Sequence, residues 1–245
     1  MKAREIFDWL DHRAPFETQL DYDNSGWIVG DPEMQVSGIH LALDCTPQVL
    51  QQMLKNGSNL LITHHPLMFT PIHSILDSDY EGGLIAEMLR NQMTMIASHT
   101  CLDQAEGGIN DALAHSIGLT EIRGTGFVRV GRLPKAMDAE SFAGHLETVL
   151  QDRVRIMGSR KQAVSHVGLC SGAGGSEWQE AREMGASAFV TGEMKHHLSL
   201  EANASGIVCF ECGHAATELP GIRALREALQ SADFIVKSDL RVTMS

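Results

Sequence analysis

Histidine is the residue type whose number and spacing point to chemistry in this sequence. Twelve histidines occur in 245 residues, and some form an adjacent pair or precede a carboxylate by four positions. The groups of this kind that follow predicted strands and are candidate metal ligands contain His64, His65, His99, Asp103, His214 and Glu218. Imidazole nitrogens combined with carboxylate oxygens suit Zn²⁺, Mn²⁺ or Fe²⁺, whereas Ca²⁺ and Mg²⁺ prefer sets made of oxygens alone. We therefore expect a site for divalent transition-metal ions.

The adjacent pair His64 and His65 directly follows a strand-like run. Neighbouring residues on an extended strand point to opposite sides, and Pro66 favours an extended conformation for His65. The two histidines are therefore not expected to chelate one ion together. Either each serves one of two neighbouring ions, or one binds a metal while the other packs.

A second polar group surrounds Glu193, which lies 128 residues after His65 and is followed by Lys195, His196 and His197. Such a loop can supply a general base or bind an anionic substrate, so Glu193 and His197 are the candidate catalytic residues. The alternative is a helix N-terminus at which Glu193 only interacts favourably with the positive end of the helix dipole.

The elements that position these residues form a repeated strand–helix–strand pattern. Apolar runs and their periods predict the pattern twice, with the second copy 128 residues after the first. The predicted elements are 36–43, 47–55 and 59–63, then 164–169, 177–184 and 188–191. Parallel sheets bind ligands at the carboxyl ends of their strands, where each polar cluster falls. We predict two similar α/β halves, 1–126 and 127–245, with the metal site between them at the strand ends. The segment 127–162 is expected to be a compact connection with one helix near 139–150.

Two further motifs have ordinary explanations beside functional ones. Cys209 and Cys212 form a CxxC, but they lie in a strand-like run, which favours core packing over a redox or metal role. All five cysteines are expected to be reduced thiols. The glycine-rich segment 171–176 could cradle a phosphate, but a tight turn is at least as consistent with it.

Composition excludes several classes of protein. The net charge of −12 argues against general nucleic-acid binding, which needs many contacts from Lys and Arg to phosphates. The N-terminus has no apolar core typical of a signal peptide, and no stretch reaches the roughly 20 apolar residues of a membrane span. We expect a cytoplasmic protein.

Five motifs in order resemble those of the Nif-three-like dinuclear-metal proteins, often labelled GTP cyclohydrolase 1 type 2 homologs. The motifs are DNSGWIVG (23–30), THHP (63–66), SHTCLD (98–103), TGEMKHH (191–197) and GHAATE (213–218). The resemblance implies two interlinked α/β domains and a toroidal homohexamer with metal sites facing an internal cavity. Some members of the family carry an extra domain between the halves, and the segment 127–162 is too short to contain it. It also implies two metal ions held by His64, His65, Asp103, His214 and Glu218, with Glu218 as the bridge.

These observations predict a metal-dependent hydrolase that acts on a nucleotide or a related small anion, either as a cyclohydrolase or as a phosphoesterase. Two ions of Zn, Mn or Fe per subunit would activate water and hold the anionic substrate. The alternative is a non-catalytic metal-binding ring or scaffold, in which the ions only hold the two halves together.

Overall fold

The computed structural model describes residues 1–238 and 240–245, and the chain divides into two compact units. Unit 1 consists of Met1–Ala105 and Ile222–Ser245, and unit 2 consists of Glu106–Gly221. The chain thus leaves unit 1 and later returns to it. This division differs from the predicted halves, 1–126 and 127–245, because the returning segment carries a strand, β11, that pairs with β2 of unit 1.

Unit 1 is built on a sheet with the strand order β1-β4-β3-β2-β11. Strand β1 is antiparallel to β4, and the other neighbours are parallel. Every residue of β2, β3 and β4 is buried, as expected for parallel strands covered on both faces. The elements are α1 (Ala3–Arg13), η1 (Phe16–Thr18), β1 (Gly26–Val29), β2 (Gly38–Ala42), α2 (Pro47–Asn56), β3 (Leu60–Thr63), α3 (Tyr80–Arg90), β4 (Thr94–Ala97), α4 (Thr100–Gln104), α10 (Asp233–Val236) and β11 (Arg241–Met244).

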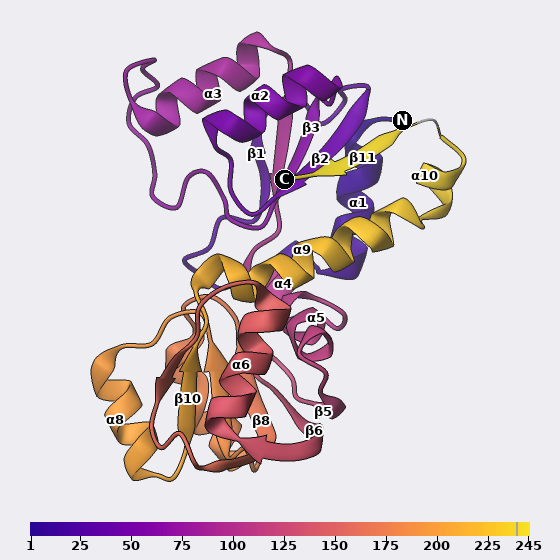
Figure 1. Ribbon diagram of the computed structural model, residues 1–245. Helices are drawn as coiled ribbons and strands as arrows, with labels where there is room; N and C mark the ends of the chain where they lie inside the picture. The colour runs from indigo at the N-terminus through magenta and orange to yellow at the C-terminus, as the bar shows by residue number, and fades with distance from the viewer. Residues whose placement is uncertain (239) are drawn as a thin grey trace. The chain divides into compact units, whose positions relative to one another are not determined.

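Helix α2 shows how the sequence sets the limits of these elements. The side chain of Thr46 accepts a hydrogen bond from the Val49 amide, Pro47 occupies the first turn, and Gly57 ends the helix at a φ of 77°. Helices α2 and α3 lie side by side over the same face of the sheet (Figure 1). The core beneath them includes Leu50, Met53, Leu61, Ile85, Met88 and Met95.

Unit 2 contains a sheet with the order β5-β6-β8-β9-β10-β7, in which β8, β9 and β10 are parallel. Apolar residues of α5 and α6 pack with one set of buried strand residues, and those of α7 and α8 pack with another. The elements are α5 (Ile109–Ser116), β5 (Thr120–Arg123), β6 (Arg129–Asp138), α6 (Ala139–Leu150), β7 (Arg155–Met157), β8 (Ala163–Cys170), η2 (Gly174–Glu177), α7 (Trp178–Glu183), β9 (Ala188–Thr191), α8 (His196–Ala204) and β10 (Val208–Glu211), and α9 (His214–Gln230) continues from unit 2 into unit 1.

The predicted repeat is confirmed down to the strand register. Ile39 lies opposite Leu60 in the pair β2–β3, and Val167 lies opposite Ala188 in the pair β8–β9, each position being 128 residues further along. The two units therefore share one α/β pattern. The helix expected near 139–150 is α6.

The segment 127–162 is compact, as predicted, but it is more than a connection. Strands β6 and β7 within it pair with β8 and β10 of the sheet. Helix α9 begins at His214 and contains Pro220, so His214 and Glu218 lie one turn apart on one helix.

Candidate metal centre

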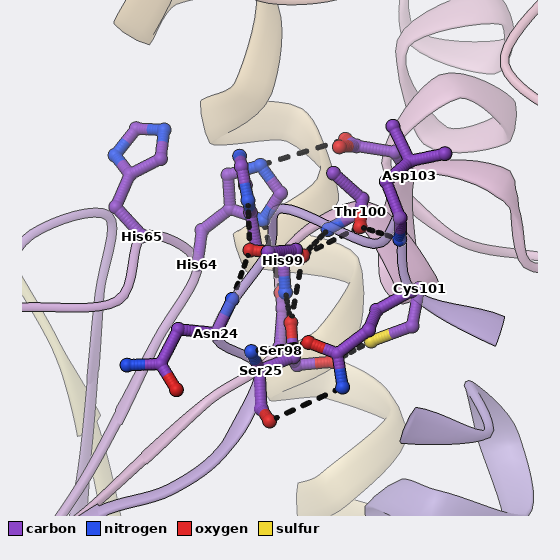
Figure 2. A network of polar contacts seen from close by, with 12 residues as sticks. Asn24, Ser25, His64, His65, Ser98, His99, Thr100, Cys101 and Asp103 are labelled. Carbon is purple, nitrogen blue, oxygen red and sulfur yellow. Dashed lines mark hydrogen bonds and ion pairs between the residues drawn. The ribbon is translucent and has the colours of Figure 1, made fainter. Parts of the chain in front are cut away.

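In unit 1, three histidines gather where β3 and β4 end. His64 and His65 directly follow β3, and His99 precedes α4. One ligand atom from each lies within 4.8 Å of the others, so the group could hold a metal ion. The ring centroids are 4.9 Å apart for His64 and His65, 5.0 Å for His64 and His99, and 5.5 Å for His65 and His99. Figure 2 shows this group with the polar residues around it.

The expectation that His64 and His65 point to opposite sides is wrong. It assumed that the alternation of a strand continues through both residues, but β3 ends at Thr63 and His64 and His65 lie in a bend. The bend places both rings in the same group as His99. The two rings therefore lie close together, a placement compatible with one shared ion and with two neighbouring ions.

Hydrogen bonds fix the orientation of both rings. The Nδ1 atom of His64 lies 3.0 Å from the carbonyl oxygen of Ser98, and Nδ1 of His65 lies 2.8 Å from Oδ1 of Asp44. Carbonyl and carboxylate oxygens only accept hydrogen bonds, so each Nδ1 carries the proton and each Nε2 presents a lone pair. Metal-binding histidines in proteins are typically held in this way. Asp44 was not predicted, although it follows β2 at the same edge of the sheet.

His99 is held by Asp23, whose role was also not predicted, although the sequence placed it in a motif. Nδ1 of His99 lies 2.8 Å from Oδ1 of Asp23, and the Thr100 amide donates to the other carboxylate oxygen. Burial alone would raise the pKa of Asp23, but hydrogen bonds from His99 and Thr100 hold that pKa well below its ordinary value. Asp23 is therefore an ionised acceptor that orients the His99 ring.

Asp103, a predicted ligand, faces His64 across this group. Its Oδ1 lies 3.4 Å from Nε2 of His64, a contact drawn in Figure 2, and the His64 side chain is fully buried. Since Nδ1 of His64 carries the proton, a nitrogen lone pair and a carboxylate oxygen face each other here. A divalent ion with bonds of about 2.0–2.2 Å to nitrogen and oxygen is suited to such a pair.

Unit 2 repeats this arrangement with His214 and Glu218. Nδ1 of His214 lies 2.8 Å from Oε1 of Glu193, and Nε2 lies 3.0 Å from Oε1 of Glu218. The Glu218 side chain is buried, whereas that of Glu193 is 58% exposed. Glu193, predicted as catalytic, thus accepts a hydrogen bond that orients His214. His197 lies in the first turn of α8 with an exposed side chain.

The glycine-rich segment after β8 packs against this pair. Gly172 has a φ of 57°, and a Cβ atom built on it would overlap with Oε1 of Glu218 and lie 3.2 Å from Nε2 of His214. The Gly172 amide donates to Thr217 Oγ1 at 3.0 Å, and its carbonyl accepts from the Glu193 amide at 2.8 Å. The segment is thus a tight turn that brings backbone close to the candidate ligands.

The predicted roles of the cysteines agree with the structure. All five are free thiols and buried. Burial raises the pKa of Cys209 to about 12 and also raises that of Cys212, so both remain protonated and unreactive at neutral pH. The CxxC therefore packs in the core of unit 2.

The family assignment follows from comparison with known proteins. A model of the Duf34/NIF3 (NGG1p interacting factor 3) family matches residues 1–245. The chain belongs to this family. The resemblance inferred from the five motifs is thereby confirmed.

This family member is similar to proteins with sequences or structures already known. It is 27% identical over 243 residues to a Clostridium acetobutylicum protein named GTP cyclohydrolase 1 type 2 homolog, a match covering 95% of this chain and 91% of that protein. A hypothetical protein of Staphylococcus aureus has a structure with a TM-score of 0.95 and 27% identity, covering 100% of this chain and 96% of the other. The structure of reduced HcgD from Methanocaldococcus jannaschii matches with a TM-score of 0.84 and 26% sequence identity. This match covers 100% of this chain and 97% of the other. These likenesses support the α/β fold of both units.

The helices were also compared with the requirements of a membrane span. Within residues 1–238 and 240–245, no helix combines the length and apolar character needed to cross a bilayer.

Proposed function

We propose that this chain binds two divalent metal ions and is a metal-dependent hydrolase of a nucleotide or related small anion. The observation that supports it is the same donor pair in both units, an imidazole held through Nδ1 whose Nε2 faces a carboxylate oxygen. The proposed ligands are His64, His65, Asp103, His214 and Glu218, with Glu218 as a bridging carboxylate.

The donor set favours Zn²⁺, Mn²⁺ or Fe²⁺ because it mixes imidazole nitrogens with carboxylate oxygens. When bound, such ions would supply Lewis acidity toward water and toward an anionic oxygen of the substrate. Asp44 and Glu193 hold the rings of His65 and His214, so the chain fixes the direction of its nitrogen lone pairs before a metal arrives. Glu193 and His197 remain the candidates for proton transfer.

The substrate class rests on charge and on the names of relatives. Lys195, His196 and His197 lie exposed at the N-terminal end of α8, where cationic side chains and backbone amides favour an anion. The relatives named GTP cyclohydrolase 1 type 2 homolog support a nucleotide. We further propose a homohexamer, which a mass measurement by light scattering would test.

Metal content tests the proposal directly. Wild-type protein purified without chelator is expected to contain about two divalent ions per chain, as in two-metal enzymes, and Asp103→Ala or Glu218→Ala to contain clearly fewer. Elemental analysis measures this. Glu140→Ala, which removes a surface carboxylate of unit 2, is the matched control and should keep the wild-type content. Near-zero metal in the wild type, even after addition of Zn²⁺, Mn²⁺ or Fe²⁺, would refute the proposal.

The variant Glu193→Gln separates the two roles open to this residue. Glutamine retains an oxygen that can accept the hydrogen bond from His214 Nδ1, but it cannot take up a proton at neutral pH. If Glu193 is a general base, turnover of the nucleotide should fall about 100-fold or more while metal content stays at the wild-type level. Turnover and metal content are both measured on the same preparation. Unchanged turnover would exclude Glu193 as the base, and no turnover of any tested phosphoester or nucleotide by metal-loaded wild type would favour a non-catalytic scaffold.

A further inference from the structure

We infer that a hollow between α7 and α8 of unit 2 binds a small zwitterion of the α-amino acid class. The hollow has a volume of about 540 Å³, which lies within the range typical of small-molecule sites. Helix α7 lines it with Trp178, Gln179, Arg182 and Glu183, and the end of α8 lines it with Glu201 and Ser205. No residue of the candidate metal centre lines the hollow. The inference therefore does not rest on the proposed metal function.

The sequence places the lining residues on one stripe of each helix. In α7, Arg182 and Glu183 follow Gln179 by three and four positions. At the end of α8, Ser205 follows Glu201 by four positions. Residues with this spacing share a helix face. The other faces of both helices carry apolar residues that pack in the core of unit 2. The polar stripes are thus the faces that border the hollow.

The charges around the hollow favour a ligand that carries both signs. Within residues 1–238 and 240–245, neither Arg182 nor Glu201 forms an ion pair with another side chain, so both are available to a ligand. Glu183 lies beside Arg182 and makes the lining net negative. A simple anion would therefore meet two carboxylates and one guanidinium, and a simple cation would be repelled by Arg182. A zwitterion can pair its carboxylate with the guanidinium and its ammonium group with a glutamate.

The end of α8 favours one orientation of such a ligand. Ser205 is the C-cap of this helix, and Glu201 lies in its last turn. The C-terminal end of a helix carries a partial negative charge, which favours a cationic group. The ammonium group is therefore expected beside Glu201, and the carboxylate beside Arg182 on the opposite wall.

A buried donor in the wall of the hollow provides an independent indication of a ligand. Trp178 is 3% exposed, and its Nε1 atom has no hydrogen-bond partner in the part of the chain that the structure describes. Buried donors in native proteins are almost always paired, so an unpaired one requires an explanation. The indole N–H can only donate, which makes a carboxylate oxygen a suitable partner. Arg182 follows Trp178 by four positions, so both donors lie on the same face of α7.

Binding of the standard α-amino acids to the full-length protein tests the inference. Each is screened at about 10 mM for a rise in melting temperature, and those that raise it are titrated by calorimetry. At least one is expected to bind with a Kd of about 1 mM or tighter. Arg182→Gln, Glu201→Gln and Trp178→Phe should each weaken that binding about 10-fold or more, because each removes a charge or a donor that faces the ligand.

Two matched variants should keep the wild-type affinity. Glu180→Gln removes an exposed carboxylate of α7 that does not line the hollow. Glu218→Ala shows whether the amino acid binds instead to an ion at the candidate metal centre, because amino acids also coordinate metals. The same ligand without its amino group, or without its carboxyl group, should bind about 10-fold more weakly or worse.

Three results would overturn the inference. The first is that no amino acid raises the melting temperature, and the second is that binding is unchanged in both Arg182→Gln and Glu201→Gln. The third is that binding is lost in Glu218→Ala, which would place the ligand on the metal centre. Circular dichroism of Arg182→Gln and Glu201→Gln shows that a lost affinity is not a loss of fold, since both side chains are exposed.

Discussion

Replacing Arg129 by methionine is expected to lower the free energy of unfolding of unit 2 by about 3–5 kcal/mol. The Arg129 side chain is 4% exposed, pairs through Nε with Asp111, and donates through Nη1 to the carbonyls of Gly126 and Val128. Asp111 is only 15% exposed and also accepts from the Gly107 amide. Removing the guanidinium leaves a largely buried carboxylate without its cation, and that desolvation cost dominates. Chemical denaturation followed by circular dichroism measures the loss.

A surface ion pair of the same unit provides the matched control. Arg160 pairs with Glu140 at 3.3 Å, and both side chains are about two-thirds exposed. Arg160→Met should therefore cost less than about 1 kcal/mol, because solvent screens the pair. In addition, Asp111→Asn should lower the free energy of unfolding by less in the Arg129→Met background than in the wild-type background. Equal losses for Arg129→Met and Arg160→Met would show that the buried pair does not stabilise unit 2.

Adding one methyl group at Gly172 is expected to weaken metal binding in unit 2 about 10–100-fold. The Cβ atom of Gly172→Ala would overlap with Glu218 Oε1 and crowd His214 Nε2. Because Glu218 is buried, its carboxylate can avoid the methyl group only by turning away from His214. Metal affinity is measured by competition with a chelator.

The control for Gly172→Ala reproduces its backbone strain without the collision. Gly206 has a φ of 83°, and a Cβ atom there meets nothing within 4 Å. Gly206→Ala should therefore lose about 1 kcal/mol of stability, the usual penalty for a left-handed alanine, and keep the wild-type metal affinity. If Gly172→Ala also keeps that affinity, Glu218 is not a ligand or is free to move.

Local patterns predicted the parts of the fold that repeat. The apolar runs that became β2, β3, β8 and β9 are continuous because these strands are buried on both faces, and caps such as Thr46 and Gly57 mark helix ends. The edge strands β7 and β11 were not predicted. In short strands with partly exposed residues, apolar and polar residues alternate only weakly. The pairing of such strands also depends on partners far away in the chain.

The candidate ligands could be predicted from the sequence because they follow strands at the carboxyl edge of each sheet. The carboxylates that accept hydrogen bonds from the histidine rings could not be predicted in this way. Asp44 lies 21 residues from His65, and Asp23 lies 76 residues from His99, so no local spacing connects each pair. The side on which His64 and His65 point was also missed, because it depends on where β3 ends.

Residue type and spacing alone determined the repeated α/β pattern, the family resemblance and the nitrogen and oxygen donors at the strand ends. These are local properties, since burial periodicity and strand–helix order are properties of short segments. Only the tertiary structure decided which nitrogen of each histidine carries the proton, and that His64, His65 and His99 form one group. The tautomer of each histidine and the grouping of the three rings depend on contacts between segments that are distant in the chain. Only folding brings those segments together.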